Sequence, residues 1–339
     1  MSTSPSISGL LSHRLSGWVR NSTLSSGSAT DLFLQRVQSL EPTGTSNSTD
    51  YFQIGSVDKA GNTLDPTTFR AVVEENLHDS TLDMTLAGVN PTTGSGFWAG
   101  NMPTQLNTLY VPIRNDADTV TSELALGNLR VSELQYRFVM NGACSFQATL
   151  EGTSGSWHTT APFPHPSWGG FDNLTPGAVH GKDARVAFGS SNIAGNKAYR
   201  LQSFTIRVQF PVQTVRELGN RQIVGQLVDT PNVTADFDLN PGDYQPADVF
   251  FPVSNDNGTS LVLSQPQDVD VYINLYDPAL AEGASVIKSW HLENMRPTTA
   301  TPLQGRVRSL TTARYSMTNV SVTTANSGGV IVSKTEIAS

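Results

Sequence analysis

The carboxylate and imidazole side chains of this 339-residue sequence are the groups best suited to chemistry, and their spacing forms no catalytic or metal-binding pattern. Two carboxylate pairs stand alone, at Asp116/Asp118 and at Asp268/Asp270. Asn255–Gly258 opens like a calcium loop but lacks the final Glu of such a loop, so we interpret it as a hairpin turn. No two histidines have metal-ligand spacing; they are His13, His78, His158, His165, His180 and His291.

The common catalytic signatures are also missing. The sequence has no G-x-S-x-G nucleophile elbow, no G-x-x-x-x-G-K-[ST] phosphate loop and no H-E-x-x-H zinc helix. The two carboxylates of a glycoside hydrolase need only meet in space, so an enzyme with a β-sandwich fold stays open as the weakest alternative. We expect no catalysis, no cofactor and no metal.

Composition narrows the class of protein further. Charged residues make up 15% of the chain and the net charge is −8, whereas a general nucleic-acid binder needs clustered Lys and Arg to neutralise phosphates. Cys144 is the one cysteine, which excludes an intrachain disulfide, and we interpret it as a small buried apolar side chain. Met1–Gly9 lacks the pattern of a signal peptide, and no apolar run reaches membrane-spanning length, so we expect no membrane association.

The elements around these residues are expected to be strands. Hydrophobic residues make up 37% of the chain, Gly and Pro number 28 and 19, and Thr, Ser, Val and Asn are plentiful, which favours an all-β protein with many turns. Apolar residues alternate with polar ones over 204–210 and again over 233–239, and 222–228 is apolar-rich. These three runs predict a three-stranded meander. Thr81–Ala87 alternates in the same way and predicts another strand.

Other segments carry weaker or different signals. Asn141-Gly142 predicts a tight hairpin between strands at 130–140 and 144–151. Phe69–Leu77 fits either a strand or a short helical stripe. The stretch 152–183 is dense in Gly, Pro, His and aromatic residues and is interpreted as a linker or crossing loop.

The two halves of the sequence echo one another. Leu124–Arg130 (LALGNLR) parallels Trp290–Arg296 (WHLENMR), and each lies between a strand and a final pair of strands. Tyr51–Val57 followed by Thr81–Ala87 is matched with 222–228 followed by 232–239. The alternative is chance similarity between two generic β meanders. The resulting division is an N-terminal arm at 1–30, a first β domain at 31–151, a linker at 152–183 and a second β domain with a polar tail at 184–339.

One order of strands and turns points to a known family. A long amphipathic strand is followed by the turn V-R-E-L-G-N-R at 215–221, a short strand, and P-x-V-T-x-x-x-D at 231–238. This order resembles the tail tube proteins of long-tailed bacterial and archaeal viruses. The resemblance implies a mainly β fold of two tandem sandwich- or barrel-like tail-tube domains joined by a Gly/Pro/aromatic-rich linker.

The same resemblance implies a structural role in the virion tail after assembly in the host cytoplasm. Single-domain tube proteins form six-fold rings, and fused pairs form three-fold, pseudo-hexameric rings that stack into a tube. The partners would be further copies of the chain and the terminator, tape-measure and distal tail proteins, with DNA passing through the lumen without specific binding. Acidic residues facing the lumen would repel its phosphates; the candidates on polar strand faces are Asp83, Asp236, Asp238 and Asp270.

The sequence also leaves a second function open. A virion or cell-surface β-sandwich could recognise a carbohydrate or a receptor. Trp157, Trp168 and Phe171 lie in the aromatic-rich stretch and would suit stacking on sugars.

Overall fold

The fold is taken from a computed structural model of the 339-residue chain. The residues described are 17–24, 32–34, 37–46, 48–52, 59–64, 67–77, 81–90, 93–114, 120–159, 179–189, 201–215, 225–229, 231–239, 253–256, 260–263, 268–280, 285–304, 312–319 and 330–333.

The fold is mainly β, as the composition predicts. The elements up to residue 158 are β1 (Trp18–Asn21), β2 (Leu32–Phe33), β3 (Val37–Thr45), β4 (Ser48–Phe52), β5 (Lys59–Leu64), β6 (Thr68–Asn76), α1 (Thr81–Leu86), β7 (Gly96–Trp98), the 3-10 helix η2 (Ala99–Thr104), β8 (Asn107–Arg114), β9 (Val120–Val139), β10 (Ser145–Gly152) and β11 (Ser154–His158). The later elements are the 3-10 helix η3 (Gly181–Asp183), β12 (Ala184–Phe188), β13 (Leu201–Gln209), β14 (Val212–Val215), β15 (Gly225–Val228), β16 (Asn232–Leu239), β17 (Val253–Asp256), β18 (Ser260–Leu263), β19 (Val269–Tyr276), β20 (Val286–Gln304), β21 (Thr312–Asn319) and β22 (Val330–Ser333).

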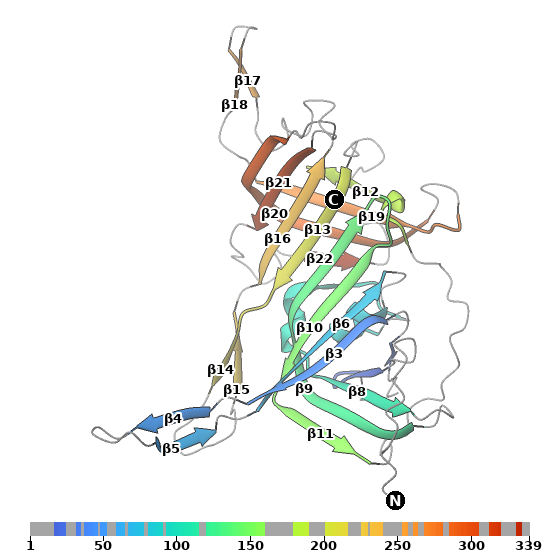
Figure 1. Ribbon diagram of the computed structural model, residues 1–339. Coiled ribbons are helices and arrows are strands. Elements are labelled where there is room, and N and C mark those ends of the chain that lie inside the picture. The colour runs from blue at the N-terminus through green and yellow to red at the C-terminus, as the bar shows by residue number, and fades with distance from the viewer. Residues whose placement is uncertain are drawn as a thin grey trace, which may run out of the picture.

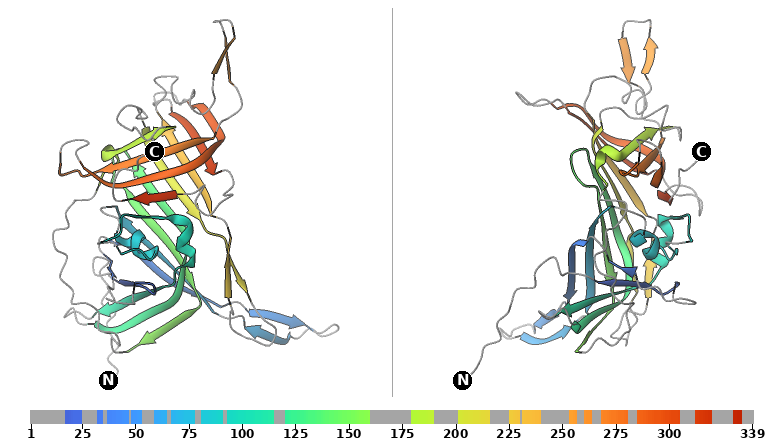
Figure 2. Two further views of the ribbon diagram at one scale, coloured as in Figure 1. Left: turned by 180° about the vertical axis from the view of Figure 1, so that it is seen from behind. Right: turned by 90° about the vertical axis from the view of Figure 1, so that its right-hand side faces the viewer.

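One large sheet runs through the molecule in the order β12-β19-β20-β21-β16-β13-β9-β10-β6-β3 and curls into a half-barrel (Figures 1 and 2). Its strands alternate between an apolar and a polar face. The ladder aligns one apolar, buried residue from each of six neighbouring strands, namely Val233, Val208, Leu134, Ala148, Val73 and Leu40. The next row, toward the start of β13 and the end of β9, is polar on the same strands, namely Thr234, Arg207, Gln135, Gln147, Glu74 and Ser39. The period of two therefore gives this sheet one face that must be covered and one that faces solvent.

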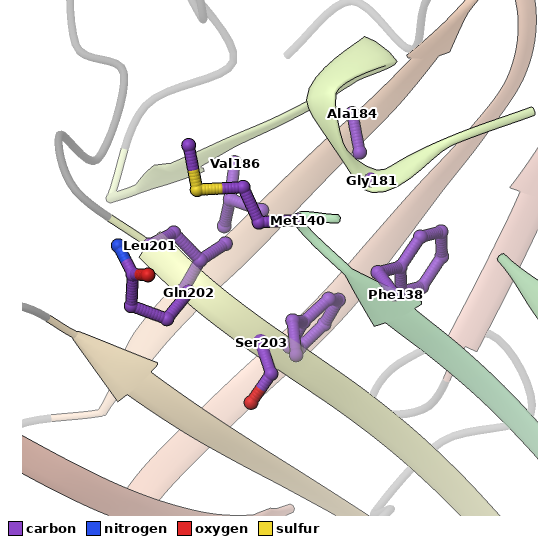
Figure 3. Close-up of a pocket in the computed structure, with 9 residues that line it drawn as sticks. Phe138, Met140, Gly181, Ala184, Val186, Leu201, Gln202 and Ser203 are labelled. Atoms are coloured by element: carbon purple, nitrogen blue, oxygen red, sulfur yellow. The ribbon is translucent and has the colours of Figure 1, made fainter. Parts of the chain in front are cut away.

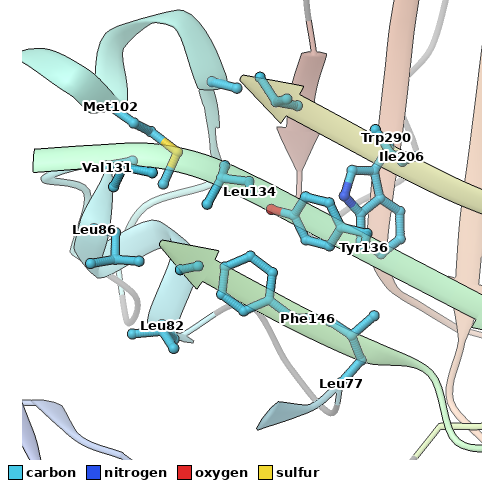
Figure 4. Close-up of a cluster of buried hydrophobic side chains, with 14 of the residues drawn as sticks. Leu77, Leu82, Leu86, Met102, Val131, Leu134, Tyr136, Phe146, Ile206 and Trp290 are labelled. Atoms are coloured by element: carbon cyan, nitrogen blue, oxygen red, sulfur yellow. The ribbon is translucent and has the colours of Figure 1, made fainter. Parts of the chain in front are cut away.

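A second layer covers the apolar face. It consists of β1, β8, β11 and the first part of β9 at one end, and of β12, β19, β22 and the first part of β20 at the other. Figure 4 shows side chains of α1, η2 and β20 gathered over β9 and β10, with Trp290 against Tyr136. Trp290 is edge-on to the rings of Tyr136 and Phe138, with centroids 5.3 and 5.2 Å away. The hydrophobic core is thus continuous between the two ends.

Three two-stranded hairpins stand outside the large sheet: β4–β5, β14–β15 and β17–β18. In the views of Figures 1 and 2, β4–β5 and β14–β15 project from one end of the molecule and β17–β18 from the other. Leu227 on β15 is 62% exposed.

Two strand predictions are wrong. Thr81–Leu86 is the helix α1, and every residue from Leu82 to Ala87 is buried. The alternating polar residues of this segment therefore do not form a solvent-exposed face. The segment at 222–228 is not the middle strand of a meander: β15 pairs with β14, and β13 pairs directly with β16.

Other predictions are resolved by the pairing. The hairpin between β9 and β10 at Asn141-Gly142 is confirmed, but its last pair is Arg137↔Ser145, so the loop is longer than the predicted tight turn. The ambiguous run Phe69–Leu77 is strand β6 followed by Leu77. The expected linker 152–183 contains β11, which pairs with β9, because a Gly/Ser-rich segment can still add an edge strand. Most of that linker and Trp168 and Phe171 lie outside the described residues.

Candidate assembly interface

The junction between β9 and β13 joins the first half of the chain to the second, edge to edge. Seven residue pairs run from Ser203↔Val139 to Gln209↔Glu133. The rings of Phe204 and Phe138 stack with centroids 5.3 Å apart on the apolar face. On the polar face Arg207 Nε lies 3.0 Å from Glu133 Oε1. Both faces of this junction are therefore occupied by complementary side chains.

The pairing of β9 recurs in β20. β9 pairs with β8 through its first part and with β10 through its second, and β20 pairs with β19 and β21 in the same way. Each long strand changes partner just after an asparagine with positive φ: Asn128 with φ 55 and Asn294 with φ 50. Gly127 and Asn128 therefore do not divide β9, and the strand predicted at 130–140 is the second part of this longer strand.

The irregularities of the two ladders also coincide. Ser132 in β9 and Thr298 in β20 are each skipped by the partner strand. Ser132 Oγ donates to the carbonyl of Thr149 in β10 at 3.3 Å, and Thr298 Oγ1 donates to the carbonyl of Ser316 in β21 at 3.1 Å. Bulges are specific features of a ladder, so their agreement fixes which residues of β9 and β20 correspond.

The first strands of the two halves correspond as well. β3 pairs with β6 in the register in which β13 pairs with β16, and each ladder has a bulge at its start, between Val37 and Ser39 and between Leu201 and Ser203. A projecting hairpin separates the members of each pair, β4–β5 in the first and β14–β15 in the second. β1 lies against β8 as β12 lies against β19.

The large sheet has open strand edges within the part of the chain that the structure describes, and two of them correspond to the strands of the internal junction. β3 pairs with β6 alone, and residues 296–304 of β20 pair with β21 alone. These are the positions that β13 and the second part of β9 occupy at the internal junction. Open edges expose unpaired N–H and C=O groups and invite another strand.

A buried charged cluster holds the two halves together beside the internal junction. Asp83 of α1 is 2% exposed and Lys288 of β20 is 1% exposed. Lys288 Nζ donates to Asp83 Oδ2, and the hydroxyl of Tyr136 in β9 donates to the same oxygen at 2.8 Å. Lys288 Nζ also lies 5.2 Å from the ring centroids of Tyr136 and Trp290. An isolated buried charge would be very costly, so these partners make the cluster possible.

Burial and the neighbouring Asp83 carboxylate raise the pKa of Tyr136 well above its ordinary value of 10.0. The phenol therefore stays protonated and serves as a hydrogen-bond donor. Asp83 had no local signal for this role, because Lys288 is 205 positions away in the sequence.

The four acidic residues predicted to share a surface are not brought together. Asp83 is in the core, so its assignment to the polar face of a strand is wrong. Asp236 and Asp238 do lie on the polar face of β16, where Ser316 Oγ donates to Asp236 at 2.5 Å and Ser203 Oγ donates to Asp238 at 2.7 Å. Asp270 is on β19, in the other layer of the molecule.

Asp270 has a small polar environment of its own. Its carboxylate lies 3.3 Å from His291 Nε2 and accepts from the backbone N–H of Asn294 at 2.9 Å. The hydrogen bond with His291 is the main cause that lowers the pKa of Asp270. The His291 ring also stacks on Tyr272 with centroids 4.3 Å apart.

A hollow lined mostly by apolar side chains has no catalytic character. It lies at the end of the β9–β13 junction, and Figure 3 shows Met140, Leu201 and Val186 around it. Its one hydroxyl, that of Ser203, is bonded to Asp238. Among the residues that the structure describes, no group of three His, Cys, Asp or Glu is placed to hold a metal ion.

Two further features concern single segments. Cys144 is buried, as expected, and burial raises its thiol pKa to about 12. Within the described ranges, no helix has the length and apolar character needed to cross a bilayer.

Comparison with known proteins gives distant structural similarity alone. No family model matches the sequence. No curated protein matches it either. Two solved structures with similar chains are the anti-feeding prophage baseplate (14% identity, 48% of this chain and 99% of that chain, TM-score 0.34) and its tube-terminating cap (14%, 48% and 95%, TM-score 0.32). A third is the sheath–tube complex of the PVC extracellular contractile injection system in its extended state (15%, 51% and 94%, TM-score 0.30). At these TM-scores the similarity carries no argument about this chain.

Proposed function

We propose that this chain is a structural subunit of a viral or virus-like tail tube. Its copies join edge to edge into rings, the rings stack, and the lumen conducts genomic DNA during ejection. The observation that carries the proposal is the curled sheet, which is covered on its apolar face, polar on the other and open at β3 and at the end of β20. Closing such a sheet into a ring removes both open edges and leaves the polar face around a hollow.

The proposal includes two tandem tail-tube domains, which the recurring strand pairing supports. Three chains would then supply six such domains to one ring. The hairpins β4–β5 and β14–β15 at one end and β17–β18 at the other are placed to contact neighbouring rings. The subunit would assemble in the host cytoplasm with terminator, tape-measure and distal tail proteins, and would reside in the virion tail without enzymatic activity or a cofactor.

Solution mass and electron micrographs of the purified full-length protein test this function. Rings or tubes with a central hole are the expected result, and a protein that stays monomeric at high concentration with no rings would refute it. Asp236 and Asp238 on the polar face are the remaining candidates for repelling DNA in the lumen. The double variant Asp236→Lys/Asp238→Lys should retain nuclease-protected DNA within tubes, whereas Asp270→Lys, a single charge reversal in the other layer, should not.

A second candidate function rests on one side chain. Trp157 on the edge strand β11 is 54% exposed, and an exposed tryptophan suits stacking on a sugar. A discrete monomer that binds a glycan column, with binding lost on Trp157→Ala, would favour a carbohydrate-recognition module instead of a tube subunit.

A further inference from the structure

We propose that β20 of one subunit pairs antiparallel with β3 of the next, in the register Thr299↔Thr45, Ala300↔Gly44 and Thr301↔Thr43. This inference rests on the proposed assembly into rings and adds the residues that meet. The internal β9–β13 junction serves as its template, because β20 corresponds to β9 and β3 corresponds to β13.

The register follows from two sets of corresponding positions. The shared bulges at Ser132 and Thr298 place Thr299, Ala300 and Thr301 of β20 at the positions of Glu133, Leu134 and Gln135 of β9. The shared bulges at the start of β3 and β13 place Thr43, Gly44 and Thr45 at the positions of Arg207, Val208 and Gln209. At the internal junction these two triplets are paired as Gln209↔Glu133, Val208↔Leu134 and Arg207↔Gln135.

The proposed contact is limited to three pairs because the ladder of β20 shifts again between Thr301 and Gln304. Across the central pair, Gly44 and Ala300 replace the larger Val208 and Leu134. The side chains at the polar pairs also differ, since threonines replace the Arg207–Glu133 ion pair. The contact between subunits is therefore weaker per residue than the junction inside the chain.

The direction of the backbone groups agrees with this pairing. At the internal junction Phe210 donates its N–H to the carbonyl of Ser132 at 2.8 Å, and Met140 donates to the carbonyl of Gln202 at 3.1 Å. Even-numbered residues of β13 therefore direct their backbone groups toward β9. The corresponding residues of β3 include Pro42, whose missing N–H would face the open edge, where a sheet tolerates proline. Pro42 lies just outside the three proposed pairs and limits pairing of this edge with unrelated strands.

The internal junction has a buried ion pair, Asp83–Lys288, that the contact between subunits lacks. The serine at position 122 of β9 takes the place that Lys288 has in β20, since Ser122↔Ile113 corresponds to Lys288↔Leu275. A first half cannot supply the lysine that Asp83 requires. The buried pair therefore favours contact of a first half with a second half, over contact with another first half, along the β9 edge, and leaves the β20 edge for a second copy.

Disulfide cross-linking tests the register. Thr45 and Thr299 correspond to a non-hydrogen-bonded pair, in which Cα atoms are about 4.5 Å apart, within the range for a disulfide. Thr43 and Thr299 would be diagonal neighbours about 7–8 Å apart, which is too far. Native Cys144 is buried and stays unreactive. The experiment uses the full-length double variant Thr45→Cys/Thr299→Cys, oxidised mildly after assembly, with Thr43→Cys/Thr299→Cys as the matched control.

A ladder of disulfide-linked species on non-reducing gels is expected for the first variant and monomer alone for the control. Each single-cysteine variant should also stay monomeric on the gel, because the contact is head-to-tail. Mixing separately purified Thr45→Cys and Thr299→Cys chains should give linked dimers, which shows that the bond joins two molecules. Rings in micrographs without this cross-link, or with the control linked instead, overturn the register but not the ring. The absence of rings as well as cross-links overturns both proposals.

Discussion

Asn128 in β9 and Asn294 in β20 share a left-handed backbone conformation at corresponding places in their ladders. Among the described residues they are the two non-glycine positions with positive φ. Asparagine adopts this conformation more readily than most residues because its short polar side chain can bond locally. At both places the strand passes from the covering layer into the large sheet, so the backbone there must turn without ending the strand.

Replacing either asparagine should separate backbone conformation from side-chain contacts. Asn128→Gly and Asn294→Gly should retain the free energy of unfolding, whereas Asn128→Val and Asn294→Val should each lose about 1–2 kcal/mol because a β-branched residue resists positive φ. Urea denaturation measures the difference. Gln135→Val, at a half-buried position in β9, is the control. Equal stability of the Val and Gly variants would show that the left-handed conformation is not required.

The Asp83–Lys288 pair should depend on both partners. Lys288→Met leaves a buried carboxylate without its cation and should cost about 3–5 kcal/mol, whereas the double variant Asp83→Leu/Lys288→Met should recover much of that loss. Chemical denaturation of the wild type, Asp83→Leu, Lys288→Met and the double variant gives the coupling. Removal of the exposed Arg296–Asp268 pair by Arg296→Met is the control and should change stability little. Additive losses in the double variant would mean that the two side chains do not stabilise one another.

Alkaline pH should destabilise the protein through Tyr136. Its pKa is higher in the folded state than in the unfolded chain, so the unfolded chain loses this proton first. Stability is therefore fully present below pH about 10 and falls as pH rises above it. The fall should be smaller in Tyr136→Phe, and unchanged in the control Tyr276→Phe. Urea midpoints measured from neutral to alkaline pH test this, and an identical fall in wild type and Tyr136→Phe would exclude the contribution.

Asp270 should contribute to the change in stability at acidic pH. Its pKa is lowered in the folded state, so its contribution is present above the ordinary value of 3.8 and is lost as pH falls below it. Asp270→Asn should lower the urea midpoint near neutral pH and reduce the loss of stability on acidification. Glu151→Gln, an exposed change on β10, is the comparison. An acid profile for Asp270→Asn that parallels the wild-type profile would contradict the expectation.

The contact between subunits should be sensitive to charge at Ala300. In the proposed register this residue takes the place of Leu134, which is buried at the internal junction. Ala300→Asp would place an unpaired carboxylate at the proposed contact, which should cost the assembly several kcal/mol. The folded variant, identified by a cooperative melting transition, should form no rings in micrographs. Thr299→Asp, on the polar face, should still assemble; rings formed by Ala300→Asp would contradict the proposed contact.

Local patterns predicted the mainly β class and many individual strands, because a half-buried strand has a period of two. Asn141-Gly142 predicted the position of its hairpin correctly, although the loop after the last pair, Arg137↔Ser145, is longer than a tight turn. The same reasoning failed at Thr81–Leu86. That helix is buried on all sides, so neither a helical nor a strand period describes the burial of its residues.

The candidate site was harder to predict because it depends on long-range pairing. The similarity of 124–130 to 290–296 located the two asparagines, but the strands matched around it were partly displaced: β6, and not Thr81–Ala87, has the pairing of β16. No residue near Asp83 in the sequence indicates that its partner is Lys288. An acidic residue between Leu82 and Met84 looks solvent-facing until its distant cation is known.

The open edges belong to two different strands, β3 and β20, with different sequences. The proposed contact joins β20 of one copy to β3 of the next and is therefore head-to-tail. Every copy in a closed ring would then face the same way around the axis. A stack of such rings would have a top unlike its bottom. Growth would then have a direction, and each end would need its own capping protein.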